Sequence, residues 1–148
     1  LQAGNLNAFS ANNTLTPEGD LIYGAGAFGT GDNDIVLDEL SYTFPLGDRT
    51  QVVLRANAGG SDSFTDTLNP FFDGDGASGA LSRFGTRHGI YYLADGTGIG
   101  LRHEFGDSVE LSLGYAANSE TANIPLDGSG LFNGPYGAIA QLTFKPSK

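Results

Sequence analysis

The sequence contains no cysteine, methionine or tryptophan, and it is poor in cations. Without cysteine the chain has no disulfide, no thiol nucleophile and no thiolate ligand for zinc. Only seven Lys and Arg stand against 17 Asp and Glu, which gives a formal net charge of -10 at pH 7. A nucleic-acid interface needs clustered cations to neutralise phosphates. The composition therefore argues against DNA and RNA as partners.

Long apolar segments are also missing. The longest unbroken apolar run, Ile90–Ala94, is far shorter than the roughly 20 residues of a transmembrane helix, so only β-strands remain as a means of crossing a bilayer. The length of 148 residues suits one ordinary domain. Its 23 glycines are about twice the usual share, but they follow no three-residue period, which excludes collagen.

Apolar and polar residues alternate with a period of two in several segments, and no sustained helical period occurs. We therefore predict an all-β chain with strands over residues 1–9, 39–46, 51–58, 97–105, 109–117 and 136–145. In the first hairpin, facing Phe44 with Leu54 and Tyr42 with Ala56 gathers the apolar side chains on one surface.

The connections between these strands alternate in length. They are short at 47–50 and 106–108, and long at 10–34, 60–96 and 118–134. Transmembrane β-barrels show this asymmetry, with short periplasmic turns, long external loops and strands that are apolar outward and polar inward. The pattern predicts antiparallel up-and-down strands that form part of a transmembrane β-barrel. About six strands make an incomplete barrel, since a water-filled pore needs about 16.

Aromatic residues gather near both ends of the predicted strands: Phe44, Phe105 and Phe144 near the short turns, Tyr115 and Tyr136 near the long loops. Barrel proteins place aromatic girdles at the two membrane interfaces. His103 falls on the lipid-facing side of its strand, close to the turn, where a polar side chain costs less than at the midplane.

Three groups of polar residues are candidates for contact with solutes. The face opposite the apolar one predicts a pore lining of Glu39, Thr43, Arg55, Asn57, Arg102, Glu104, Glu110, Gln141 and Lys145. Part of the 60–96 loop is expected to fold inward and narrow the pore with Arg83, Arg87 and His88. Acidic loop residues predict an electronegative vestibule that concentrates cations: Glu18, Asp20, Asp32, Asp34, Glu120 and Asp127. The alternative is that these acids only keep the loops solvated.

Motifs of catalysis and cofactor binding fail on their context. Residues 24–29 have dinucleotide-binding glycine spacing, but loop residues follow where a helix is required. The segment 73–76 suggests calcium, yet the last ligand position of such a loop falls on Phe84. The two histidines, one in a loop and one on a strand, support neither a metal site nor a triad. We therefore expect no enzyme, no cofactor and no metal centre.

Several sequence blocks, in order along the chain, resemble one known family. They are Leu1–Asn5, Val36–Asp48, Gly98–Leu101 followed by Glu104 and Phe105, Leu111–Tyr115, Gly130–Gly134 and Ala140–Phe144. The sequence is similar here to cyanobacterial outer-membrane porins, which are grouped with the carbohydrate-selective porins and are sometimes labelled iron-uptake porins.

The resemblance implies a bacterial outer-membrane channel for passive diffusion of ions and small hydrophilic solutes, with inorganic cations, iron species and sugars as candidates. It implies contact with outer-membrane lipid and peptidoglycan binding through an N-terminal region. A homotrimer is also compatible with the resemblance, which does not decide the oligomeric state. We expect residues 1–148 to be a partial barrel domain that lacks this wall-binding region and the remaining strands. The alternative is a soluble β-sandwich that binds carbohydrate or acts as an adhesin, which fits the alternation equally well.

Overall fold

The structure, a computed structural model, describes residues 2–3, 35–37, 39–57, 59–60, 63–72, 79–80, 85, 88–93 and 95–146. The chain divides into two compact units, one of Leu1–Asp38 with Thr67–His88 and one of Glu39–Asp66 with Gly89–Lys148. In the first unit, β1 (Gln2–Ala3) pairs antiparallel with β2 (Ile35–Val36), and η5 (Pro70–Phe72) is a short 3-10 helix. The rest of the strand predicted over 1–9 lies outside the described residues.

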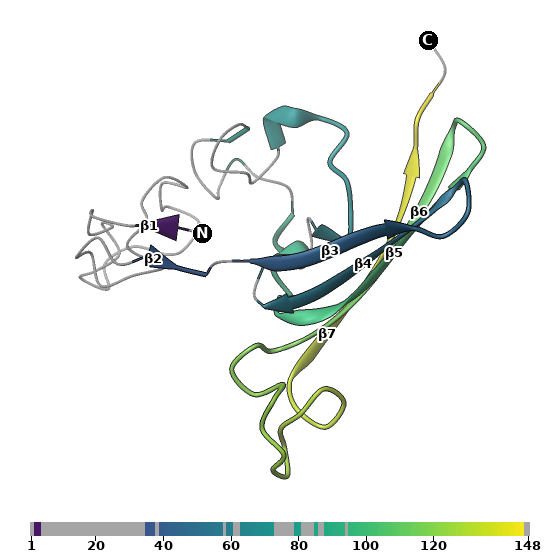
Figure 1. The fold of residues 1–148 in the computed structure, drawn as a ribbon. Helices are drawn as coiled ribbons and strands as arrows, with labels where there is room; N and C mark the ends of the chain where they lie inside the picture. Colours follow the sequence, from purple (N-terminus) through teal and green to yellow (C-terminus); the bar gives the residue numbers. More distant parts are fainter. Residues whose placement is uncertain are drawn as a thin grey trace. The chain divides into compact units, whose positions relative to one another are not determined.

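The second unit contains one antiparallel sheet of five strands. These are β3 (Leu40–Pro45), β4 (Thr50–Asn57), β5 (Thr97–Phe105), β6 (Val109–Ala117) and β7 (Tyr136–Phe144). Each strand pairs with its neighbour in sequence, in the order β3-β4-β5-β6-β7 (Figure 1). The all-β, up-and-down prediction is therefore confirmed. A 3-10 helix, η7 (Gly89–Tyr92), precedes β5.

Short turns lie at one end of this sheet. Leu46 N donates to Thr50 O at 2.8 Å to close the β3–β4 turn, where Gly47 has a φ of 77°. Gly106, with a φ of 73°, serves the same purpose in the β5–β6 turn, since a left-handed backbone conformation favours glycine. In Figure 1 both turns lie at the upper right, and the β6–β7 connection, residues 118–135, lies at the bottom.

The β3–β4 pairing differs from the predicted one by two residues. Phe44 lies opposite Val52 and Tyr42 opposite Leu54, because the tight turn already pairs Pro45 with Gln51. Over Ser41–Pro45 a shift of two residues keeps the side chains on their predicted faces, whereas a shift of one would have exchanged the faces. A β-bulge between Leu40 and Ser41 changes the register again and places Leu40 opposite Asn57, which was predicted for the other face. The predicted faces of Ser41–Pro45 were therefore right, and the predicted cross-strand partners were wrong.

One face of the sheet, called here the apolar face, is largely uncovered. Large hydrophobic side chains on it are 42 to 66% exposed: Tyr42, Leu54, Ile99, Phe105, Leu113, Tyr136, Leu142 and Phe144. The opposite, polar face holds the buried polar side chains Arg55, Glu110, Ser112 and Thr143. This is the reverse of a soluble protein, in which the apolar face is buried.

His103 lies on the apolar face, as its parity predicts. Its pairing places it between Thr50 and Leu111, and its Nδ1 is hydrogen-bonded to Thr50 Oγ1 at 2.8 Å. The ring also makes an edge contact with Phe105, with centroids 4.5 Å apart.

Among the described residues, no helix is both long and apolar enough to cross a membrane.

Candidate lumenal site

A short stretch of the long β4–β5 connection lies against the polar face. This stretch, Ser63–Asp66, is called here the strap. Phe64, at its centre, is 0% exposed and packs with Val53 and Ala116. A Cβ built on Gly114 would lie 2.5 Å from Phe64 Cδ2, and one built on Gly100 would also overlap the ring. The paired glycines Gly100 and Gly114 therefore form a socket for the Phe64 ring, and any larger residue at either position would overlap the ring.

Arg55 supports the strap from below. Its guanidinium carbon lies 4.3 Å from the Phe64 ring centroid, a cation–π contact that gains strength where water is excluded. Nε donates to Gly96 O at 2.7 Å, and Nη1 donates to Gly60 O. Arg55 is only 2% exposed, and its contacts include two backbone carbonyls and the Phe64 ring. The residue ties both ends of the long connection to β4.

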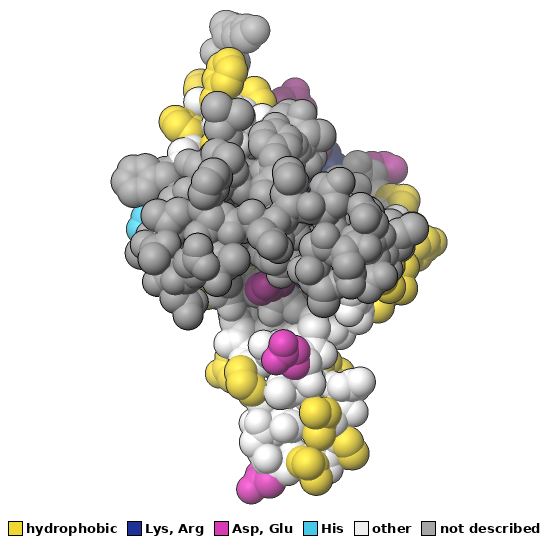
Figure 2. Space-filling view, turned by 90° about the vertical axis from the view of Figure 1, so that its left-hand side faces the viewer, with side chains coloured by type: hydrophobic (Ala, Val, Ile, Leu, Met, Phe, Trp, Pro, Cys, Tyr) yellow, Lys and Arg dark blue, Asp and Glu magenta, His cyan; other side chains and the backbone are white. Residues whose placement is uncertain are grey.

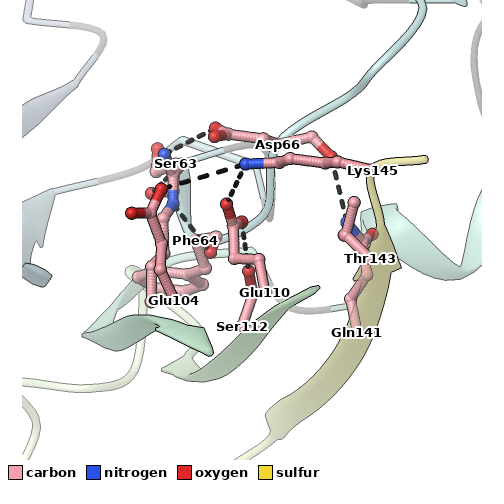
Figure 3. Close-up of polar contacts among 10 residues, drawn as sticks. Ser63, Phe64, Asp66, Glu104, Glu110, Ser112, Gln141, Thr143 and Lys145 are labelled. Atoms are coloured by element: carbon pink, nitrogen blue, oxygen red, sulfur yellow. Dashed lines mark hydrogen bonds and ion pairs between the residues drawn. The ribbon is translucent and has the colours of Figure 1, made fainter. Parts of the chain in front are cut away.

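Arg102, on β5, grips the strap from its other side. Nε donates to Phe64 O and Nη2 donates to Ser63 O, each at 3.1 Å, while Nη1 forms an ion pair with Asp66 Oδ1 at 2.5 Å. Ser63 Oγ in turn donates to Glu39 Oε1 at 3.0 Å. Figure 3 shows the strap residues Ser63, Phe64 and Asp66 above the sheet, facing the polar side chains of β5 to β7.

A second ion-pair group lies nearer the short turns. Lys145, which follows the last residue of β7, donates to Glu110 Oε2 at 2.7 Å and lies 3.9 Å from Glu104 Oε1 (Figure 3). Ser112 Oγ donates to the other oxygen of Glu110 at 3.2 Å. The hydrogen bond with Glu110 raises the pKa of the Lys145 ammonium above its ordinary value. Lys145 therefore stays protonated beside this nearly buried carboxylate.

Gln141 joins both ends of the long connection to β7. Its Nε2 donates to Asp66 O and to Thr143 Oγ1, each at 2.9 Å. Its Oε1 accepts a hydrogen bond from Tyr91 Oη at 2.6 Å. Because η7 contributes Tyr91, Gln141 contacts two separate parts of the 60–96 connection. These hydrogen bonds position segments of the connection on the polar face.

The buried carboxylate makes Lys145 a sensitive position. Lys145→Met in the full-length protein is expected to lower the free energy of unfolding by about 2 kcal/mol, because the Glu110 carboxylate loses the cation beside it. This loss is smaller than that for a fully buried ion pair, since Lys145 is partly exposed. Denaturant unfolding followed by circular dichroism measures this loss. Adding Glu110→Gln to Lys145→Met removes the uncompensated charge and should restore most of the stability. A double variant as unstable as the single one contradicts this role.

The structure places most of the predicted pore-lining residues on the polar face, but their contact with solutes stays a prediction. Arg55, Arg102, Glu104, Glu110, Gln141 and Lys145 make the contacts given above, and Glu39 contacts the strap. Thr43 is exposed on β3, and Asn57 is half-buried at the end of β4. Arg102 forms its ion pair with Asp66, and Lys145 lies within ion-pair distance of both Glu104 and Glu110.

The loop candidates are mostly beyond the described residues. Arg83 and Arg87 lie there, as do Glu18, Asp20, Asp32 and Asp34 and the motifs at 24–29 and 73–76. His88 is exposed and belongs to the first unit, so its relation to the sheet is not defined. Glu120 and Asp127 belong to the β6–β7 connection. Within the described ranges, no three His, Asp or Glu side chains gather as a metal site would require.

Sequence reasoning missed Ser63, Phe64 and Asp66 as site residues. The available signal was the group of glycines at 98, 100 and 114 on the predicted polar face, where the absence of side chains leaves space above the strands. A thin place in a strand face marks the close approach of another segment. Nothing in the pattern indicated which residue fills it.

An antiparallel sheet with an uncovered apolar face and a polar face that carries an inserted strap is typical of the wall of a transmembrane β-barrel. The comparison with protein families agrees. The family described as "Carbohydrate-selective porin, OprB family" matches residues 1–148, and the chain belongs to this family.

Two relatives extend this finding to individual proteins. The chain is 35% identical to the uncharacterized protein alr4550 of Nostoc sp. over 156 residues, which cover 97% of this chain and 27% of the relative. It is 36% identical to the uncharacterized protein sll0772 of Synechocystis sp. over 114 residues, which cover 77% of this chain and 20% of the relative. The chain thus spans about a quarter or less of the relatives it matches. No solved structure matches it.

Proposed function

We propose that this chain forms part of the wall of a passive diffusion channel in the bacterial outer membrane. The observation that carries the proposal is the reversed burial of the sheet. Its apolar face is largely uncovered, while its buried side chains include an arginine, a glutamate, a serine and a threonine. Such a surface is stable where lipid covers the apolar face and water fills the space beyond the polar face.

A soluble β-sandwich is the less favoured function. Sandwich sheets bury their apolar side chains against a second sheet about 10 Å away. Here the loop segment packs on the polar face instead, and Phe64 is at the centre of that contact. The burial of Arg55 and Glu110 on this side would be costly in a dry core, whereas a lumenal wall with an inserted loop accommodates them.

We further propose that the strap narrows the lumen. It lies on the face that the proposed channel turns inward, where it contacts Arg55, Arg102 and Gln141. A constriction in the 60–96 connection was expected from the sequence through Arg83, Arg87 and His88. The contacts of Ser63–Asp66 with the polar face support the strap as a part of that connection that narrows the lumen.

The solutes proposed are sugars and other small hydrophilic molecules, with inorganic cations, iron species among them, preferred over anions. The description of the family favours sugars. The preference for cations rests on charge, since the net charge is -10 and the lumenal arginines already bind carbonyls and Asp66. Acids set selectivity only near a constriction, and Asp66 belongs to the strap.

Conductance of the full-length protein in a planar lipid bilayer under a KCl gradient tests this function. We expect stepwise conductance and a reversal potential on the cation-selective side. An anion-selective reversal potential would keep the channel and remove the role of the acids. Folded protein that inserts without any conductance would contradict the diffusion channel.

A further inference from the structure

The β6–β7 connection, residues 118–135, has an ordered backbone. Asn118 N donates to Pro135 O at 3.0 Å, which closes the base of the connection beyond the two strands. Gly130 N donates to Thr121 O at 2.9 Å, which draws its two limbs together. The connection therefore presents its side chains from a defined framework.

One end of this framework packs against the apolar face of the sheet. The Phe132 ring stacks on Tyr115, with centroids 6.0 Å apart, and Tyr115 stacks on Tyr136 at 5.4 Å. Tyr115 Oη also donates to Leu131 O at 2.5 Å. Since Tyr115 lies on the apolar face of β6, the connection extends over that face and continues its aromatic surface past the ends of the strands.

The apolar side chains of the connection remain uncovered. Phe132 is 82% exposed, and Leu126 and Leu131 are also exposed. Figure 2 shows hydrophobic and acidic side chains together at the lower end of the molecule, where the β6–β7 connection lies in Figure 1. Asp127 accepts a hydrogen bond from Asn133 Nδ2 at 3.0 Å, so polar groups flank the exposed ring. An apolar surface beside fixed polar groups suits an interface between hydrocarbon and water.

We propose that Phe132 and Leu131, together with Tyr115 and Tyr136, form a membrane-contact band and that the β6–β7 connection lies on the outer leaflet of the lipid bilayer. This inference rests on the proposed function, since it needs lipid against the apolar face. It assigns to a loop a contact that girdle residues on the strands usually make.

Lipid fits this surface better than a second copy of the chain. The exposed large hydrophobic side chains of the connection are Leu126, Leu131 and Phe132. A stable protein interface takes roughly 20 to 30 residues from each side. The band is also continuous with the apolar face, which lipid covers in the proposed channel. The ring stack fixes Phe132 before any contact, which lowers the entropic cost of binding.

Site-directed spin labelling of the full-length protein in lipid vesicles tests the band. A nitroxide on Phe132→Cys is compared with one on Leu113→Cys, on the apolar face at mid-strand, and one on Asp107→Cys, in the exposed β5–β6 turn. The measured quantity is the ratio of collision with oxygen, which partitions into lipid, to collision with a water-soluble nickel chelate. We expect a ratio above one at position 132, between a higher value at 113 and a value below one at 107.

The controls separate this inference from the proposed function. A ratio below one at 132 with a ratio above one at 113 would overturn the band and leave the channel wall intact. A ratio below one at 113 would count against the channel wall itself. Low collision with both reagents at 132 would indicate a protein contact and also overturn the band. Leu131→Cys gives a second reading if the first variant does not insert.

Discussion

Phe64→Ala in the full-length protein is expected to lower the free energy of unfolding by about 3 to 5 kcal/mol and to raise the single-channel conductance. The ring is fully buried in the glycine socket, so its loss leaves a cavity beside Val53 and Ala116. It also removes the partner of the Arg55 guanidinium. Without this anchor the strap should leave the polar face and widen the proposed lumen. Denaturant unfolding and planar-bilayer recording measure the two effects.

Two comparisons isolate the anchor. Phe71→Ala removes the same atoms from an exposed ring in η5 and should leave the stability within about 0.5 kcal/mol of the parent. Gly114→Val should reproduce the effects of Phe64→Ala by filling the socket, whereas Gly89→Val adds the same atoms where open space surrounds the Cβ. Lower stability with unchanged conductance would show that the strap supports the sheet without narrowing the channel.

Arg102→Met should destabilise the full-length protein by about 3 kcal/mol and increase its preference for cations. The substitution removes two hydrogen bonds to strap carbonyls and the ion pair with Asp66. Hydrogen bonds from charged donors contribute more to stability than neutral ones, and loss of the guanidinium leaves the two strap carbonyls and Asp66 without these donors. The free Asp66 carboxylate then adds negative charge to the strap. The reversal potential in a KCl gradient should move further toward the cation-selective side.

The partner variant supplies the decisive comparison. Asp66→Asn should move the reversal potential in the opposite direction, and the Arg102→Met/Asp66→Asn cycle should give a coupling of about 1 kcal/mol, since Asp66 is partly exposed. Arg49→Met changes the net charge equally in the exposed β3–β4 turn and should leave selectivity unchanged. If Arg49→Met and Arg102→Met shift the potential equally, net charge alone determines selectivity.

The alternation of residues was sufficient to predict most of the fold. In β5 and β6 it located the strands and the turn between them, and it placed Arg102 and Glu110 on the polar face. Side chains point to opposite faces with a period of two, so the assignment follows from residue order alone. The pairing of Phe44 was less secure, because turn geometry sets the register and a shift of two residues leaves the pattern unchanged.

The strap shows what residue order does not encode. Alternation indicates a strand and its faces, but it does not indicate which distant loop residue packs on them. The contacts of Phe64 with Gly114 and of Asp66 with Arg102 could therefore not be predicted from the sequence. The ion pairs of the polar face, Arg102 with Asp66 and Lys145 with Glu110 and Glu104, likewise join segments that the alternation does not relate.

Local pattern thus determined the strands, their faces and the short turns, because those depend on neighbouring residues. Only the tertiary structure decided which charge is neutralised, which ring is buried and which loop lies over the apolar face. Those outcomes depend on close approach between segments far apart in sequence, where small differences in side-chain volume and hydrogen-bond geometry decide the contact. The contact of Phe64 with Gly100 and Gly114 on the polar face and that of Phe132 with Tyr115 on the apolar face are examples.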